Sequence, residues 1–455
     1  MTSFAIAGLL LFAAGEPRIF SLDAGVSVWD VATLDVNGDN RGDVVAICCD
    51  ELSDPLNKYL AVFLADDSGG YASTPALKTR IDPSVGAFFE AEIDGTPPKE
   101  ILAANSDGAT SLGYKDGELK TLMEFPFVSM FPTGSREPGF LKGAAEDLDE
   151  DGIDEWFVPM PSGFSIRNSK GPLADIRCDV KSNIRTGSGI SISSRYPAYH
   201  AFEQGEGRRK GIAFLSDEFA DFAYGDGWTQ HKRFKIPVNL DDKWDTSANM
   251  EDINADGMPD LIVTQTQGTI NLKALTQVYL AEGTMAYPDK PTATFESNGS
   301  FAAPMLKDVN GDKKLDLVFI NIPFGVKFFV NLFVWRKLGV DLEIYLYTES
   351  GFATKPDYTT SVSIDAPDGK EQSAYALGDF NGDGNTDAAF GVGRDKMLLH
   401  AGGDVRFISP KPYLTLTVPA FGVARARDLN GNAAEDLIIF HPGITGKERI
   451  EVLVF

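Results

Sequence analysis

The stretch Asp379–Phe390, DFNGDGNTDAAF, has acidic or amide side chains at its first, third, fifth and ninth positions and then enters an apolar segment. Gly384, at the sixth position, permits the left-handed bend that such a tight loop requires. Alternate side chains on a tight turn converge on one point. The stretch therefore predicts an oxygen-lined loop that leads directly into a β-strand.

The same pattern returns along the chain and defines a repeating unit of about 55 residues, one of which carries an insertion. Six copies are well preserved, the copy at Glu92 is degenerate, and a strongly diverged copy is placed at Glu203 by its spacing. The loops begin at residues 35, 92, 147, 203, 252, 308, 379 and 428.

This repeat length is that of a four-stranded propeller blade. The last unit ends one strand short, whereas Glu16–Gly25, EPRIFSLDAG, is a strand without a blade. We therefore predict an all-β fold, a single eight-bladed β-propeller over residues 16–455, closed by pairing of the N- and C-terminal strands in one blade. A seven-bladed ring is the alternative, because the unit at Glu203 is strongly diverged.

The insertion lies near residues 323–340. Pro323, an apolar run and the basic pair Arg336 and Lys337 before Gly339 predict a short inserted helix. It is too short to cross a membrane. Two interpretations of the segment 323–339 stay open, namely a helix that packs against its own blade and a contact for a partner.

The N-terminus has an apolar segment, Phe4–Phe12, followed by the small residues Ala13 and Gly15. This pattern predicts a signal peptide over residues 1–15 and a secreted, periplasmic or cell-surface location. No lysine or arginine precedes the apolar segment, so an uncleaved apolar strand or anchor is the alternative. No later stretch has the ~18 uncharged apolar residues of a transmembrane span.

The chain has 66 acidic and 41 basic residues, a formal net charge of −25. Such a charge repels phosphate backbones, so we expect no nucleic-acid partner. Only three cysteines occur, Cys48, Cys49 and Cys178, which excludes a disulfide framework. The excess acid is either spread over the solvated surface or used to bind cations.

The loop pattern favours cations. Four oxygen donors and a backbone carbonyl at position seven suit Ca²⁺, which takes six to eight oxygen ligands, better than Mg²⁺. An EF-hand places its closing acid at position twelve and enters a helix, whereas here the acid is at position nine and a strand follows. We expect about six structural Ca²⁺ sites. The predicted ligands are Asp35, Asn37, Asp39, Asp43, Asp147, Asp149, Asp151, Glu155, Asp252, Asn254, Asp256, Asp260, Asp308, Asn310, Asp312, Asp316, Asp379, Asn381, Asp383, Asp387, Asp428, Asn430, Asn432 and Asp436.

The loops differ in charge. The third, with four carboxylates, is expected to bind calcium most tightly, and the eighth has only two. The loop at Glu92 contains two prolines and is expected to be metal-free or weak. In the loop at Glu203, Arg209 and its basic neighbours stand where ligands would be, and they either replace the ion or are solvated turn residues.

These loops resemble those of the FG-GAP or VCBS repeat family, whose calcium loops are similar to those of the integrin α-chain propeller. The resemblance covers nearly the whole chain. Asn40, Lys313 and Ala433 depart from it by replacing the glycine at position six. The tripeptide Arg41–Asp43, RGD, gives little support for adhesion, because a calcium-ligating Asp43 should point inward.

No catalytic constellation is visible, so we expect a noncatalytic platform that binds a protein or surface ligand through one face of the ring. Two alternatives stay open. A carbohydrate-binding, lectin-like propeller would use exposed aromatic side chains, and a polysaccharide lyase would need a basic residue and a carboxylate or bound cation in one groove. The tryptophans to inspect are Trp29, Trp228, Trp244 and Trp335.

Overall fold

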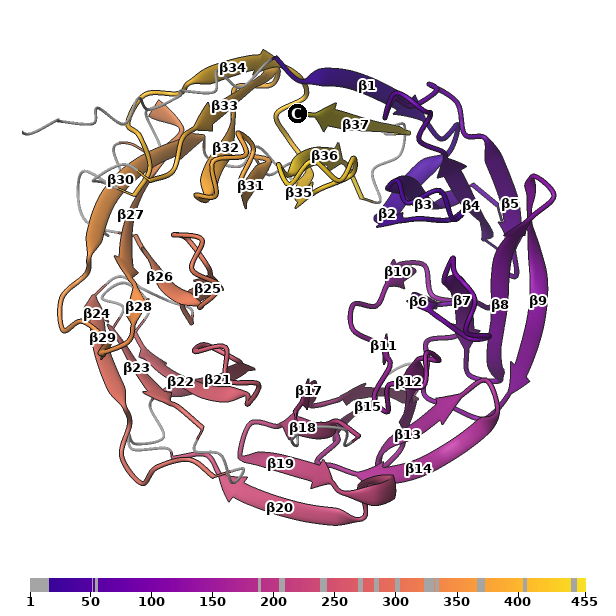
Figure 1. Ribbon diagram of the computed structural model, residues 1–455, viewed down its shortest axis with the longest axis horizontal. Helices are drawn as coiled ribbons and strands as arrows, with labels where there is room; N and C mark the ends of the chain where they lie inside the picture. The colour runs from indigo at the N-terminus through magenta and orange to yellow at the C-terminus, as the bar shows by residue number, and fades with distance from the viewer. Residues whose placement is uncertain are drawn as a thin grey trace, which may run out of the picture.

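The computed structural model shows an all-β ring in which eight sheets follow one another around a central axis (Figure 1). The structure describes residues 16–50, 52–53, 56–186, 190–203, 209–237, 244–268, 273–281, 286–298, 303–322, 331, 335–365, 373–403, 407–442 and 448–455. The ring consists of eight sheets of four or five strands each, so the propeller has eight blades and the seven-bladed alternative is wrong.

The first four blades lie between residues 27 and 235. Blade 1 is β2 (Ser27–Leu34), β3 (Asp43–Asp50), β4 (Asn57–Phe63) and β5 (Leu77–Ile81). Blade 2 is β6 (Ala87–Ala91), β7 (Glu100–Asn105), β8 (Gly108–Lys115) and β9 (Glu118–Pro126), with the two-residue β10 (Gly139–Phe140) added in parallel to β6. Blade 3 is β11 (Ala145–Glu146), β12 (Glu155–Met160), β13 (Gly163–Asn168) and β14 (Gly171–Arg177), and a separate hairpin of β15 (Lys181–Thr186) and β16 (Ile190–Arg195) follows it. Blade 4 is β17 (Ala198–Phe202), β18 (Gly211–Leu215), β19 (Phe219–Tyr224) and β20 (Gln230–Lys235), with the 3-10 turn η1 (Asp226–Trp228) before its last strand.

The other four blades complete the circle. Blade 5 is β21 (Asp245–Glu251), β22 (Asp260–Gln267), β23 (Lys273–Tyr279) and β24 (Ala293–Asn298). Blade 6 is β25 (Met305–Lys307), β26 (Asp316–Asn321), β27 (Lys337–Tyr345) and β30 (Tyr358–Asp365), with the small hairpin of β28 (Tyr347–Thr348) and β29 (Gly351–Phe352). Blade 7 is β31 (Tyr375–Gly378), β32 (Asp387–Val392), β33 (Lys396–His400) and β34 (Leu414–Thr417). Blade 8 is β35 (Val423–Arg427), β36 (Asp436–Phe440), β37 (Arg449–Val454) and β1 (Arg18–Asp23).

The ring closes as predicted, because blade 8 takes its outer strand from the N-terminal part of the chain. β1 pairs antiparallel with β37, from Arg18 opposite Val454 to Asp23 opposite Arg449. Without β1 the outer edge of β37 would present unpaired backbone groups to other chains.

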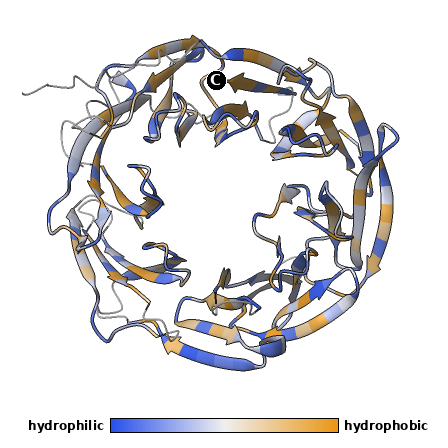
Figure 2. Cartoon of the chain, viewed as in Figure 1, coloured by the Kyte–Doolittle hydropathy of each residue, from blue (hydrophilic) through white to orange (hydrophobic). Residues whose placement is uncertain are grey.

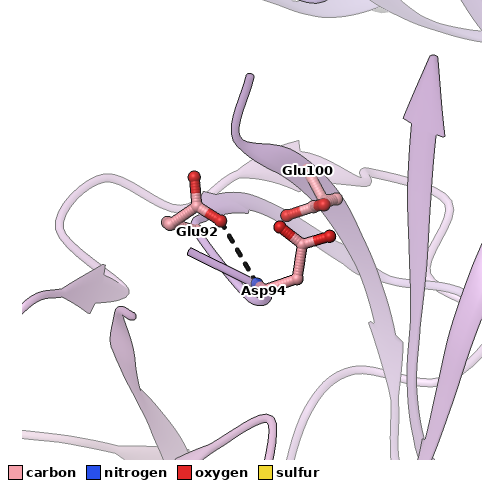
Figure 3. Close-up of side chains that lie close together, drawn as sticks. All are labelled: Glu92, Asp94 and Glu100. Atoms are coloured by element: carbon pink, nitrogen blue, oxygen red, sulfur yellow. Dashed lines mark hydrogen bonds between the residues drawn. The ribbon is translucent and has the colours of Figure 1, made fainter. Parts of the chain in front are cut away.

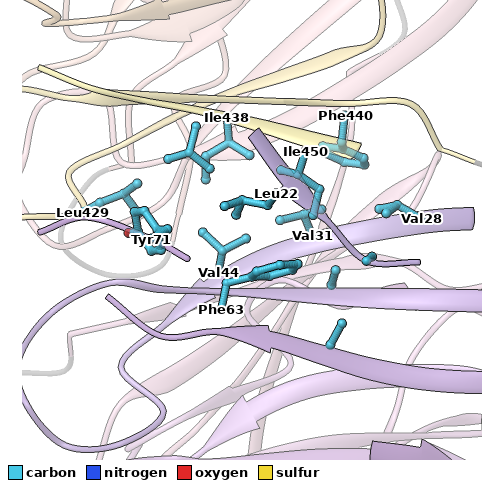
Figure 4. Packing of buried hydrophobic residues seen from close by; sticks show 14 of the residues in the cluster. Leu22, Val28, Val31, Val44, Phe63, Tyr71, Leu429, Ile438, Phe440 and Ile450 are labelled. Atoms are coloured by element: carbon cyan, nitrogen blue, oxygen red, sulfur yellow. The ribbon is translucent and has the colours of Figure 1, made fainter. Parts of the chain in front are cut away.

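The core lies between neighbouring blades. Second strands such as β36, DLIIF, are buried at every residue. One face of the sheet packs against the preceding blade and the other face against the following blade. One cluster joins blades 8 and 1, where Leu22 and Ile450 contact the region of Val44 (Figure 4). Outer strands face solvent, and β20 is largely hydrophilic (Figure 2).

The inserted helix is wrong at its C-terminal end, since Lys337–Gly339 begin strand β27. The apolar residues Val340, Leu342 and Ile344 of this strand are buried at alternate positions, as in a blade. Residues 323–330 and 332–334, the body of the predicted helix, lie outside the described residues, as does the predicted signal peptide at 1–15. Within the described part of the chain, no helix has the length and apolar character needed to cross a bilayer.

Candidate metal loops

Every well-preserved acidic loop connects the first and second strands of its blade. Residues 35–43, for example, join β2 to β3, and residues 252–260 join β21 to β22. Because the connection is the same in each blade, the loops lie at the same end of the ring. We call them the acidic belt, which comprises residues 35–43, 92–100, 147–155, 252–260, 308–316, 379–387 and 428–436.

Backbone hydrogen bonds link the loops of neighbouring blades. In six cases the N–H at position eight donates to the carbonyl at position one or two of the preceding loop, which fixes those two loops against each other, whereas Pro259, at position eight of the fifth loop, has no N–H to donate. These bonds are Gly42 to Leu429 (2.9 Å), Asp154 to Glu92 (2.8 Å), Lys210 to Leu148 (2.7 Å), Leu315 to Ile253 (2.8 Å), Thr386 to Val309 (3.4 Å) and Glu435 to Asp379 (2.7 Å).

The first-position carboxylate organises each loop from inside. Asp35 accepts hydrogen bonds from the backbone N–H groups of Gly38, Asp39 and Asn40 at 2.8, 3.0 and 2.8 Å. The side chain at position three, Asn37, in turn accepts from Asp39 N–H at 3.1 Å. The carboxylate thus bends the chain around itself, as Asp side chains do in turns.

Two positions have left-handed backbone in the well-preserved loops, whereas in the second loop Pro97 stands at position six and only position four is left-handed. Position six is left-handed as predicted, and Asn40, Lys313 and Ala433 adopt φ of 62, 69 and 70° where glycine is missing. Position four is left-handed too, even at Glu150 and Ala255. Sequence reasoning missed position four, although most loops carry glycine there.

The ninth-position acid ties the loop to its blade. Asp260 is fully buried and accepts hydrogen bonds from Ile253 N–H, at position two, and from Ala281 N–H, after the third strand, at 2.9 and 2.7 Å. Burial raises the pKa of Asp260 to about 7. Since a carboxylate has about four lone-pair sites, this structural role is compatible with the predicted ligand role. The same two bonds form at Asp43, Asp316, Asp387 and Asp436.

The third loop brings three carboxylates together. Asp147, Asp149 and Asp151 each offer an oxygen within 4.8 Å of the others. Asp149 Oδ1 is buried and has no hydrogen-bond partner. Buried oxygens normally have a partner, so this one is available to bind a cation. Its second oxygen, however, accepts from Arg209 Nη2 at 2.6 Å, and Lys170 Nζ lies 3.2 Å from Asp151.

Arg209 therefore acts on the loop before its own. Its guanidinium lies 4.7 Å from the ring centroid of the buried Trp228 and pairs with Asp149 of the third loop. The next residue, Lys210, pairs with Glu146 at 2.8 Å. The basic residues of the diverged unit are thus not only solvated turn residues, because they neutralise acids of blade 3.

The second loop is closer to a metal-loop arrangement than its sequence indicated. Glu92, Asp94 and Glu100, at positions one, three and nine, bring carboxylate oxygens within 4.8 Å of one another (Figure 3). Glu92 Oε1 accepts from Gly95 N–H at 2.8 Å, as the shorter Asp does elsewhere. Burial raises the pKa of Glu100 to about 7. The spacing of the acids was the available signal, and the longer glutamates reach the same point.

The other loops have mixed donor sets. In the fifth, Asn254 Nδ2 donates to Asp256 at 3.0 Å, so the side chains at positions three and five touch. In the eighth, the amides of Asn430 and Asn432 both donate to the carbonyl oxygen of Phe455, at 3.3 and 3.0 Å. The eighth loop is therefore the weakest candidate, in agreement with its two carboxylates.

The RGD tripeptide is built into the first loop. Asp43 is fully buried, and Arg41 Nη2 lies 2.9 Å from both Asp39 and Asp67. The expectation that Asp43 points inward is confirmed. Of the tryptophans, Trp228 is a core residue, whereas Trp335 is 67% exposed.

Comparison with known proteins agrees with the repeat. Residues 252–319, which contain two loops of the acidic belt, match the FG-GAP-like repeat family. No curated protein matches the chain. The match and the eight blades confirm the FG-GAP-like repeat propeller expected from the sequence.

Several solved structures are distantly similar. The Vibrio cholerae biofilm matrix protein Bap1 is 12% identical, with a TM-score of 0.33, over 98% of this chain and 89% of that one. BBS1N in complex with ARL6DN is 10% identical, with a TM-score of 0.34, over 95% and 96%. The WD40 domain of Toxoplasma gondii coronin is 12% identical, with a TM-score of 0.37, over 95% and 94%.

Proposed function

We propose that this FG-GAP-like repeat propeller is a calcium-stabilised, noncatalytic platform that works outside the cytoplasm and binds a protein or surface ligand through one face. The acidic belt carries the proposal. Its well-preserved loops share one donor pattern, and most neighbouring loops are hydrogen-bonded to each other. A cation in one loop would therefore stabilise contacts to the next blade.

Calcium would hold the oxygens of positions one, three, five and nine together and neutralise their charge. Six ions carry twelve positive charges, so the formal net charge would change from −25 to −13. The buried, unpartnered Asp149 Oδ1 supports this fit. Extracellular calcium modules have dissociation constants of roughly 10⁻⁴–10⁻³ M, which suits mixed Asp and Asn donor sets and a location outside the cytoplasm.

The test is thermal unfolding in EDTA and then in excess CaCl₂, with calorimetry for stoichiometry. Each site at a hundredfold excess over its dissociation constant adds about 2.7 kcal/mol to the free energy of unfolding. We expect a clear rise in the melting temperature with Ca²⁺ and a smaller one with Mg²⁺. Asp383→Ala should remove one site, while the exposed Asp289→Ala should leave the stoichiometry unchanged. Equal melting in EDTA and calcium, with no heat of binding, would refute the calcium part.

A specific cavity favours the carbohydrate alternative. It has a volume of about 530 Å³ and lies between blades 6 and 7, lined by the hydroxyl side chains of Thr359–Ser361 and by Phe390 and His400. Hydroxyl groups beside an aromatic ring suit a sugar. A glycan array with and without EDTA separates the two roles. Specific glycan signals lost in Phe390→Ala support a lectin, and a blank array favours a protein ligand.

The polysaccharide lyase is the weaker alternative. It requires a basic residue beside a carboxylate, and Lys99 and Glu90 line one cavity on the inner side of blade 2. Incubation with uronate-containing polysaccharides, followed by ultraviolet absorbance of unsaturated products, decides this point. Absorbance that rises with the wild-type chain and not with Glu90→Gln would establish an enzyme.

A further inference from the structure

The innermost strands of blades 8, 1 and 2 line a cavity of about 350 Å³ that is open to solvent, which we call the inner cavity. Most of the residues that line it belong to β35, β2, β6 and β10 and to the segment that follows β10. Figure 1 shows these strands as neighbours at the inner rim of the ring. Four basic side chains line it, although the chain as a whole carries a net charge of −25. They are Lys99, Lys142, Arg425 and Arg427.

Arg425 is fixed in place before any ligand arrives. Its Nη2 lies 2.7 Å from Asp30 Oδ1, and its Nη1 donates to the carbonyl of Val31. Its guanidinium lies 5.1 Å from the ring centroid of Phe440. The other oxygen of Asp30 accepts from Phe140 N–H at 2.8 Å. The three blades are therefore connected at this point, and the positive charge has a defined position.

The positive charges of Lys142 and Arg427 are not neutralised in this way. Among the residues that the structure describes, no carboxylate forms an ion pair with either of them. Partial burial and the nearby positive charges of Arg425 and Arg427 lower the pKa of Lys142. Three positive groups thus face one another with a single acid, Asp30, between them.

On the opposite side of the cavity, the positive charge of Lys99 is neutralised by acidic side chains. Lys99 pairs with Asp154 at 2.8 Å, and the carboxylate of Glu90 also acts on Lys99. The unbalanced charge is therefore concentrated on the side of Lys142 and Arg427. Phe140 and Leu141 add apolar surface beside it.

We propose that the inner cavity binds a compact organic oxyanion, a carboxylate or a phosphate ester, held by Lys142 and Arg427 against the fixed charge of Arg425. Guanidinium groups recognise carboxylate and phosphate oxygens through paired N–H donors. The volume lies within the range of small-molecule sites. A long polyanion is disfavoured, because Thr33 and Leu34 of the cavity directly precede the acidic belt. Binding requires no calcium, so this inference is independent of the metal proposal.

The test is isothermal titration calorimetry of the full chain in EDTA, with glucuronate, citrate, glucose 6-phosphate and inorganic phosphate as probes. We expect at least one probe to bind, about tenfold more weakly in Lys142→Gln and in Arg427→Gln, because each variant removes a charge-assisted hydrogen bond to the anion. Lys273→Gln, an exposed change on blade 5, has the same charge difference and should bind as wild type. The preferred probe distinguishes carboxylate from phosphate.

Three outcomes overturn the proposal. These are no binding by any probe, equal binding by wild type and both cavity variants, and tighter binding of polyglutamate than of the small anions. Melting curves of each variant in the same buffer verify folding. If calcium has no effect on melting while the anion still binds, the metal proposal fails and this inference stands.

Discussion

At the scale of single residues, the six well-preserved loops impose a left-handed backbone on the residue at position six, whether or not it is glycine. Ala433 has φ of 70°, whereas its neighbour Ala434 is not left-handed. An L-residue pays roughly 1–2 kcal/mol in this region, and glycine loses about 0.5–1 kcal/mol through its greater freedom when unfolded. Ala433→Gly should therefore stabilise the protein by about 0.5–1 kcal/mol in urea unfolding.

The matched change at the next residue should have the opposite sign. Ala434 is buried, so Ala434→Gly removes a packed methyl group and adds backbone entropy to the unfolded state. We expect a loss of about 1 kcal/mol. Equal effects of the two substitutions would contradict left-handed strain at Ala433.

A second residue-scale prediction concerns the ion pair between Arg209 and Asp149. Because the guanidinium occupies one oxygen of a predicted ligand, it should compete with Ca²⁺ for the third loop. Arg209→Gln should tighten calcium binding at one site by about threefold to tenfold in titration calorimetry, and it should lower the stability of the calcium-free protein. Arg233→Gln, which breaks the remote pair with Asp221, should leave calcium affinity unchanged.

At the scale of elements, most of the strands that could be predicted from the sequence were predicted from the repeat. The loop spacing located the first two strands of the blades, and the unpaired segment at Glu16 located the closure. The prediction of the inserted helix was wrong at its C-terminal end. The alternation of Val340, Leu342 and Ile344 is typical of a strand, but it directly follows an apolar run and was not separated from it. The bonds between loops and the pairing of Arg209 with Asp149 depend on how blades pack, which no single repeat encodes.

The closing strand leads to an element-scale prediction. Removal of residues 1–23 deletes β1 and exposes both the edge of β37 and the cluster around Ile450. We expect lower stability and concentration-dependent association, because a bare strand edge pairs with other chains. Light scattering after size exclusion measures the association. Removal of residues 1–15 is the control and should leave a monodisperse protein of the same stability as the full chain.

At the scale of the whole molecule, the acidic belt should make stability depend on pH. Burial raises the pKa of the ninth-position acids, to about 6 at Asp43 and to about 7 at Asp387, whereas the unfolded carboxyls titrate near 4. Between about pH 4 and pH 7 the folded state therefore binds more protons than the unfolded state. The free energy of unfolding must then fall as pH rises through this window and level off above it. The acids concerned are Asp43, Glu100, Glu155, Asp260, Asp316, Asp387 and Asp436.

In EDTA, the melting temperature should consequently be higher at pH 5 than at pH 7.5 at constant ionic strength. Burial lowers the pKa of His200, so this residue alone would make the free energy of unfolding rise with pH. The seven acids together outweigh this single histidine. Calcium competes with protons for the same carboxylates, so saturating Ca²⁺ should raise the melting temperature most at pH 7.5 and reduce the difference. Asp260→Asn should remove part of the slope in EDTA. A melting temperature that rises with pH in EDTA would show that the buried acids of the belt are ionised in the calcium-free fold.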